Sequence, residues 1–187
     1  MTLGIEFASI LGAAQQGAEW AVNVLYRDLN PAILRYLRAK EPGEAEDLAG
    51  EVWLAVVSQL ASFEGDEAGF RGWVFTIASR RVADLRRKQR RRRTDLTRDG
   101  YIRDAAAPLD PAAAVMDALD AQAAVDRLVR ALPPEQAEVV LLRVVAGLDV
   151  AHVASVMGKS PGSVRVLQHR ALKRLAERFV PKGVTER

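Results

Sequence analysis

The 187-residue sequence predicts an all-α protein of two small helical domains joined by a flexible linker, with a helix-turn-helix in the second domain. Ala, Leu, Arg and Glu dominate the chain, whereas the strictly alternating Val, Ile and Thr segments of half-buried strands are missing. Pro and Gly separate the helical stretches. We therefore predict domains at 1–93 and 121–187, and an acidic linker at 94–120.

The composition excludes several classes of protein. The 27 Lys and Arg nearly balance the 24 Asp and Glu, so the net charge of +3 identifies no partner by itself. The chain has no Cys, which excludes disulfides, thiolate zinc sites and cysteine nucleophiles. No apolar run approaches the roughly 18 residues of a membrane-spanning helix, and the start of the chain lacks the basic region of a signal peptide. We expect a cytoplasmic protein with no membrane insertion.

The first half is expected to hold three main helical stretches. Asn30-Pro31 is expected to bend or restart the first, and Glu41-Pro42-Gly43 ends it. A second helix is predicted over 44–62, with one stripe formed by Leu48, Val52, Ala55, Gln59 and Phe63. After a turn at 64–67, a third helix runs into a cluster of arginines.

The third helix carries aromatic and basic residues side by side. Segment 70–81 interleaves Phe and Trp with Arg, and segment 86–93 has seven cations in eight residues. Aromatic rings stack on unpaired bases while arginines hold phosphates, a combination typical of single-stranded nucleic-acid binding. Two alternatives stay open at this point: the aromatics form a buried core, or the arginine block binds RNA or an acidic membrane surface.

The most specific local pattern lies near the end of the chain. A short helix after Gly147 and a turn at 157–159 are followed by Ser160-Pro161, an N-cap and a proline at the first helical position. This spacing is typical of a helix-turn-helix. The second helix of the pair has a basic face opposite an apolar stripe, which suits the DNA major groove. A merely solvated face is the alternative for the charges alone, but the capped turn favours DNA binding.

Together the two halves resemble the extracytoplasmic-function (ECF) group of the bacterial sigma-70 family, over nearly the whole chain. Segment 45–53 resembles the helix that docks on the clamp of core RNA polymerase. Segment 63–84 and its trailing arginines resemble the part that recognises and melts the −10 promoter element. Leu132-Pro133-Pro134-Glu135-Gln136 and the helix-turn-helix resemble the domain that reads the −35 element.

The resemblance implies three sets of contact residues. The core polymerase contacts are Glu46, Asp47, Leu48, Glu51, Val52 and Ala55. The residues for −10 binding and melting are Phe63, Phe70, Arg71, Trp73, Arg80, Arg81, Asp84, Arg87 and Lys88. The residues for −35 binding are Ser160, Ser163, Arg165, Val166, His169, Arg170 and Lys173.

The implied partners are core RNA polymerase, through its clamp and flap, promoter DNA in duplex and single-stranded form, and an anti-sigma factor. We expect no enzymatic activity, catalytic residue, cofactor or metal. His152 and His169 are 17 positions apart, and no Cys or cluster of carboxylates supplies metal-ligand spacing around them. The alternative function is a stand-alone helix-turn-helix regulator that acts without polymerase. Such a regulator is expected to carry a ligand-binding or dimerisation domain in its first half, whereas this chain has an acidic helix and an aromatic, arginine-rich one.

Overall fold

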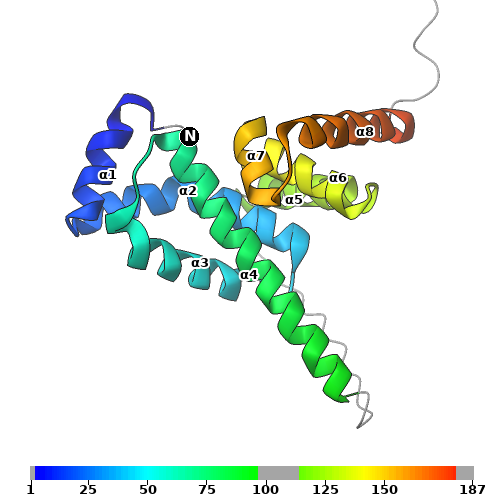
Figure 1. Ribbon diagram of the computed structural model, residues 1–187, viewed down its shortest axis with the longest axis horizontal. Coiled ribbons are helices and arrows are strands. Elements are labelled where there is room, and N and C mark those ends of the chain that lie inside the picture. Colours follow the sequence, from blue (N-terminus) through cyan, green and yellow to red (C-terminus); the bar gives the residue numbers. More distant parts are fainter. Residues whose placement is uncertain (1–2, 97–113, 180–187) are drawn as a thin grey trace, which may run out of the picture. The chain divides into compact units, whose positions relative to one another are not determined.

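The computed structural model describes residues 3–96 and 114–179. The chain divides into two compact units, Met1–Asp110 and Pro111–Arg187 (Figure 1). Every described element is helical, which confirms the all-α prediction. Most of the predicted linker lies outside the described residues, and the neighbouring helices extend into its two ends.

Six helical elements make up the described part of the first unit. They are η1 (Gly4–Glu6), α1 (Phe7–Gln15), α2 (Glu19–Lys40), α3 (Ala45–Gln59), η2 (Leu60–Ser62) and α4 (Glu67–Leu96). The predicted break after residue 40 is confirmed, but a restart at Pro31 is wrong, because α2 continues through it. Proline removes one helical hydrogen bond, and the burial of Leu29, Ile33 and Leu37 along the same helix outweighs that loss.

The core of the first unit lies between α2, α3 and α4, and α1 packs against α2. Tyr36 of α2 and Phe75 of α4 are fully buried and meet edge to face, with ring centroids 5.6 Å apart. Fully burying one large apolar side chain contributes about 1.5–3 kcal/mol. The aromatic residues of α4 therefore stabilise the helical packing from its centre.

Helix α4 changes character along its length. Its first half buries the apolar residues Phe70, Val74, Phe75, Ile77, Ala78 and Val82. Beyond Val82 the side chains are mainly charged and exposed as far as Arg92. One helix is thus anchored in the core at one end and presents a basic surface at the other.

A buried ion pair joins α2 to the first turns of α4. The Arg71 guanidinium lies 2.9 Å from the Asp28 carboxylate, and the two side chains are only 17% and 6% exposed. Removing two charges from water is costly, and losing one partner of such a pair leaves the other charge buried, which is strongly destabilising. Arg71 therefore belongs to the internal structure of the unit, although the sequence predicts it as a DNA contact.

The described part of the second unit contains α5 (Ala114–Arg130), α6 (Pro134–Val140), the π-helical segment η3 (Leu141–Val145), α7 (Val150–Met157) and α8 (Pro161–Phe179). Helix α8 packs against α6 and α7. Leu132, Ala137, Val140 and Ala171 form a core cluster, against which Val129 and Leu175 pack. The helix predicted from Glu135 to about Ala146 is present, and its last turn is π-helical.

We predict that Asp28→Ala destabilises the first unit by about 3 kcal/mol, because it leaves the Arg71 charge buried without this partner. All three tryptophans, Trp20, Trp53 and Trp73, lie in the first unit, so tryptophan fluorescence in urea follows its unfolding. The matched control is Asp84→Ala, which breaks the exposed Asp84–Arg87 pair and is expected to cost no more than about 1 kcal/mol. Equal stability losses in the two variants would contradict the structural role of the buried pair.

Candidate nucleic-acid interface

The helix-turn-helix of the second unit is fixed by caps on both of its helices. Asp149 caps α7, since its Oδ1 accepts the backbone N–H of His152 at 2.8 Å. Gly158 ends α7 in the left-handed conformation with φ 61°. Ser160 caps α8, since its Oγ accepts the backbone N–H of Ser163 at 3.2 Å. The capped turn predicted from Ser160-Pro161 is confirmed, and Asp149 is a cap that the sequence analysis missed, although Asp is a preferred N-cap residue.

Helix α8 presents the predicted residues to solvent. Val164 and Ala171 are fully buried against the rest of the unit. The exposed residues of the predicted −35 set on this helix are Ser163, Arg165, Val166, His169, Arg170 and Lys173. The helix thus offers a continuous surface of cations around the half-exposed apolar Val166, the residue types that read base edges in a major groove.

A contact with α6 also stabilises the turn between α7 and α8. Lys159 forms an ion pair with Glu135 of α6, with nitrogen and oxygen 2.8 Å apart. The Ser160 and Ser163 hydroxyl oxygens lie 2.9 Å apart, so these two predicted DNA contacts bond each other at the start of α8. Both are exposed and lie at the start of the helix that carries the exposed cations.

An aromatic cluster lies where the loop after η2 meets α4. The Phe63 ring centroid is 5.1 Å from that of Trp73 and 5.2 Å from that of Phe70. Phe70 is buried, whereas Phe63 and Trp73 are partly exposed. Of the three predicted aromatic contacts, Phe63 and Trp73 therefore reach the surface, and Phe70 supports them from below.

Most of the cations of α4 that the sequence predicts as DNA contacts are exposed. Arg80, Arg87 and Lys88 are exposed, and Arg81 lies 3.9 Å from Glu51 of α3. Asp84 forms an ion pair with Arg87 at 2.9 Å. An open hollow on this helix is lined by Asp84, Arg87, Lys88, Arg91 and Arg92. The spacing of these five residues gives one basic face with a single carboxylate inside it.

The predicted polymerase-contact residues of α3 fall on two different faces. Leu48, Val52 and Ala55 are buried in the core of the unit. Glu46, Asp47 and Glu51 are exposed. The Glu46 carboxylate lies 2.6 Å from Arg38 of α2, and this hydrogen bond holds the pKa of Glu46 below its ordinary value.

Two exposed apolar residues of α3 were missed by the sequence analysis. Leu54 and Val57 are 74% and 52% exposed, although they follow the acidic residues on the outer side of the helix. The signal was present, because 47, 50, 51, 54, 57 and 58 lie on one side of the helix at spacings of three and four. Large apolar groups beside carboxylates at a surface are typical of protein-docking sites.

The described residues contain no group of three or more His, Cys, Asp or Glu that could hold a metal ion. Among the helices that the structure describes, none has the length and apolar character to cross a membrane.

The chain thus combines a helix-turn-helix unit with a second unit that carries partly exposed aromatic residues and a basic helix face. The models of the sigma-70 family match both units: region 2 matches residues 25–92 and region 4 matches residues 122–175. The chain is 36% identical to the ECF RNA polymerase sigma factor ShbA of Streptomyces griseus, over 89% of this chain and 94% of that one. It is 31% identical to the ECF sigma factor SigD of Mycobacterium tuberculosis, over 96% of this chain and 87% of that one.

A solved structure, the sigma factor RpoE in complex with the anti-sigma factor NepR from Bartonella quintana, shares the fold. Its TM-score is 0.60 at 23% identity, and the match covers 82% of this chain and 94% of that one. The chain belongs to the ECF group of RNA polymerase sigma factors. It is a sigma factor, the subunit that binds core RNA polymerase and directs initiation at promoters.

We predict that Asp149→Ala destabilises α7 by about 1 kcal/mol, whereas Asp149→Asn keeps most of the cap. The backbone N–H of His152 holds the pKa of Asp149 below its ordinary 3.8. The ionised Asp149 carboxylate therefore contributes its full stabilisation above about pH 3.8, its pKa in the unfolded chain. That stabilisation is lost as the pH falls through the lower pKa of the folded state.

Hydrogen exchange of the α7 amides measures the stability change, and the chemical shift of the His152 amide follows the titration. Wild-type protein is expected to lose protection in α7 at acid pH, and the Asn variant is expected to lose less. Identical acid profiles in the two proteins would contradict the capping role of the ionised carboxylate.

Proposed function

We propose that this sigma factor binds promoters through the faces described above, with one unit reading duplex DNA and the other holding separated strands. The observation that carries the proposal is that one chain presents a capped helix-turn-helix with a basic outer face and, on α4, partly exposed aromatics followed by a basic face. Each surface has the chemistry of one form of DNA. A stand-alone regulator has no use for the second surface, so this alternative is not favoured.

The second unit would read the −35 element by direct contact. Helix α8 would lie in the major groove, where Arg165 and Arg170 can donate to guanine and Val166 can touch a thymine methyl group. His169 and Lys173 continue the same face, and the Ser160 and Ser163 hydroxyls lie at its start, within reach of the phosphates. The buried Val164 and Ala171 hold this face outward.

The first unit would hold the −10 element as it opens. Phe63 and Trp73 offer partly exposed rings to an unstacked base of the non-template strand. Arg80, Arg87 and Lys88 would hold the neighbouring phosphates, and the Asp84 carboxylate fixes the direction of Arg87. The contacts of the two rings with an unstacked base exist only with separated strands, so they favour the melted state.

We assign polymerase binding to two surfaces. The outer face of α3, with Asp47, Glu51, Leu54 and Val57, would dock on the clamp, and the buried Leu48, Val52 and Ala55 would hold that face in place. In the second unit, Val144 of η3 is 69% exposed and would contribute to binding the flap.

Three further assignments complete the proposal. The promoter-binding domains extend over 1–93 and 121–187, with the linker at 94–120 between them. The protein acts in the cytoplasm as a binding subunit and catalyses no reaction itself. An anti-sigma factor that covers these surfaces would keep it inactive, as the complex of RpoE with the anti-sigma factor NepR suggests by analogy.

Run-off transcription with sigma-free core polymerase and a library of promoter fragments tests the function. We expect specific transcripts only when the protein is added, and losses of about tenfold or more for Arg165→Ala and Trp73→Ala, because each removes a contact of about 1–3 kcal/mol. Arg178→Ala, at the far end of α8, is the matched control and is expected to transcribe normally. No response from any template, together with duplex binding by the protein alone, would overturn the proposal.

The basic face of α4 predicts a specific dependence on salt. Lys88→Ala and Arg91→Ala are each expected to reduce the slope of log Kd against log salt concentration by about 0.7–0.9, because one phosphate contact is lost. The affinity of the polymerase holoenzyme for a promoter fragment at several salt concentrations gives the slope. Arg27→Ala removes an exposed cation of α2 and should leave the slope unchanged, so a slope altered equally by all three variants would argue against a localised phosphate-binding face.

A further inference from the structure

The loop from η2 to α4 is held at its beginning by a side chain from α1. The amide nitrogen Nε2 of Gln15, the last residue of α1, donates to the backbone carbonyls of Leu60 at 3.1 Å and Phe63 at 2.8 Å. These carbonyls stand on either side of the short turn Leu60–Ser62. One amide group from a distant part of the sequence therefore fixes both ends of that turn.

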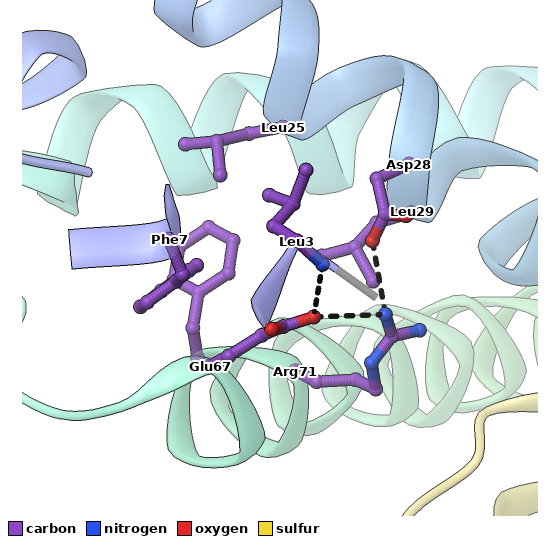
Figure 2. Close-up of a pocket in the computed structure, with 8 residues that line it drawn as sticks. Leu3, Phe7, Leu25, Asp28, Leu29, Glu67 and Arg71 are labelled. Atoms are coloured by element: carbon purple, nitrogen blue, oxygen red, sulfur yellow. Dashed lines mark hydrogen bonds and ion pairs between the residues drawn. The ribbon is translucent and has the colours of Figure 1, made fainter. Parts of the chain in front are cut away.

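The same N-terminal segment holds the other end of the loop. The Glu67 carboxylate, at the start of α4, accepts the backbone N–H groups of Leu3 at 3.0 Å and Gly4 at 2.8 Å. Figure 2 shows Leu3 above Glu67, with Arg71 and its partner Asp28 to their right. Phe7 of α1 packs in the same place, with its ring centroid 5.6 Å from that of Phe70.

The loop between these two attachments has a defined shape. Asp66 caps the start of α4 by accepting the N–H of Gly69 at 2.8 Å. Gly65 has φ 152°, and a Cβ there would lie 3.0 Å from the Phe63 ring. Gly65 thus lies against the Phe63 ring, which stays partly exposed, and Ser62, Glu64 and Asp66 are exposed around it.

Nothing in the promoter-binding function assigned above uses α1. The match to region 2 begins at residue 25, after this helix has ended. The residues of α1 make their polar side-chain contacts with the loop through Gln15, and its apolar residues Phe7, Ile10, Leu11 and Ala14 are buried. Because Gln15 bonds the loop, the position of α1 helps to determine the shape of the loop beside Phe63 and Trp73.

We propose that the N-terminal segment 3–15 is a clasp that holds loop 60–66 in the shape that accepts an unstacked base, with Gln15 as the positioning residue. Gln15 contacts no base itself and acts through the Leu60 and Phe63 carbonyls. This inference rests on the proposed function of Phe63 and Trp73. A loop that is already ordered loses less conformational freedom when it binds, so the clasp raises the affinity for the captured base.

The test uses holoenzyme reconstituted with core polymerase and single-stranded oligonucleotides that span the −10 element of a promoter found by run-off transcription. Each position in turn is replaced by an abasic site, and the Kd is measured. Wild-type holoenzyme is expected to lose about tenfold or more in affinity at the position whose base is captured. Gln15→Met keeps the length of the side chain but removes its donor, and Gln16→Met makes the same change at the exposed neighbour.

With Gln15→Met we expect the loss at the captured position to shrink to about threefold or less, because two hydrogen bonds to the loop are gone. Tryptophan fluorescence and binding to core polymerase should stay at their wild-type values, which a general loss of folding would not allow. Gln16→Met should retain the full discrimination. Glu67→Ala releases the other end of the loop and should reduce discrimination in the same way, so the test stands even if one variant folds poorly.

The possible failures are distinct. A wild-type holoenzyme with no abasic-sensitive position would overturn the base-capture role of the loop, and the clasp with it. If the wild type has such a position and both Gln15→Met and Glu67→Ala lose as much affinity there as the wild type does, the clasp would be overturned. The base-capture role of the loop would then stay intact.

Discussion

The ion pair between Arg71 and Asp28 is the interaction on which the arrangement of the first unit depends. It fixes the first turns of α4 on α2, and Glu67, one turn before Arg71, receives the N-terminal backbone. The aromatic residues Phe70 and Phe75 lie on the same helix and are buried in the core. Arg71 thus serves the packing of α4 on α2, although the sequence predicts it as a DNA contact.

The two units present different kinds of surface: a helix with fixed caps in the second unit, and aromatic rings beside a loop in the first. The second unit holds a rigid helix in one orientation through caps at Asp149 and Ser160, which suits a groove of regular shape. The first unit places aromatic rings at a loop and continues α4 into a basic face, which suits a strand without regular structure. Both place the apolar residues of a helix in the core and so turn its charged residues outward.

The fold and much of the candidate site could be predicted from the sequence where local signals decide the structure. The capped turn at Ser160-Pro161 and the basic face of α8 followed from residue types and helical spacing. Contacts between distant residues could not be predicted in this way. Nothing in the local pattern pairs Arg71 with Asp28, 43 residues apart.

Site-specific photo-crosslinking within the holoenzyme tests whether the two units engage two forms of one promoter. A photoreactive amino acid at His169 of α8 should crosslink to upstream duplex DNA in both closed and open complexes. The same group at Ser62, in the loop beside Phe63, should crosslink to the non-template strand only after the promoter has opened. Equal crosslinking from Ser62 to closed duplex, or none to DNA at any stage, would contradict the account.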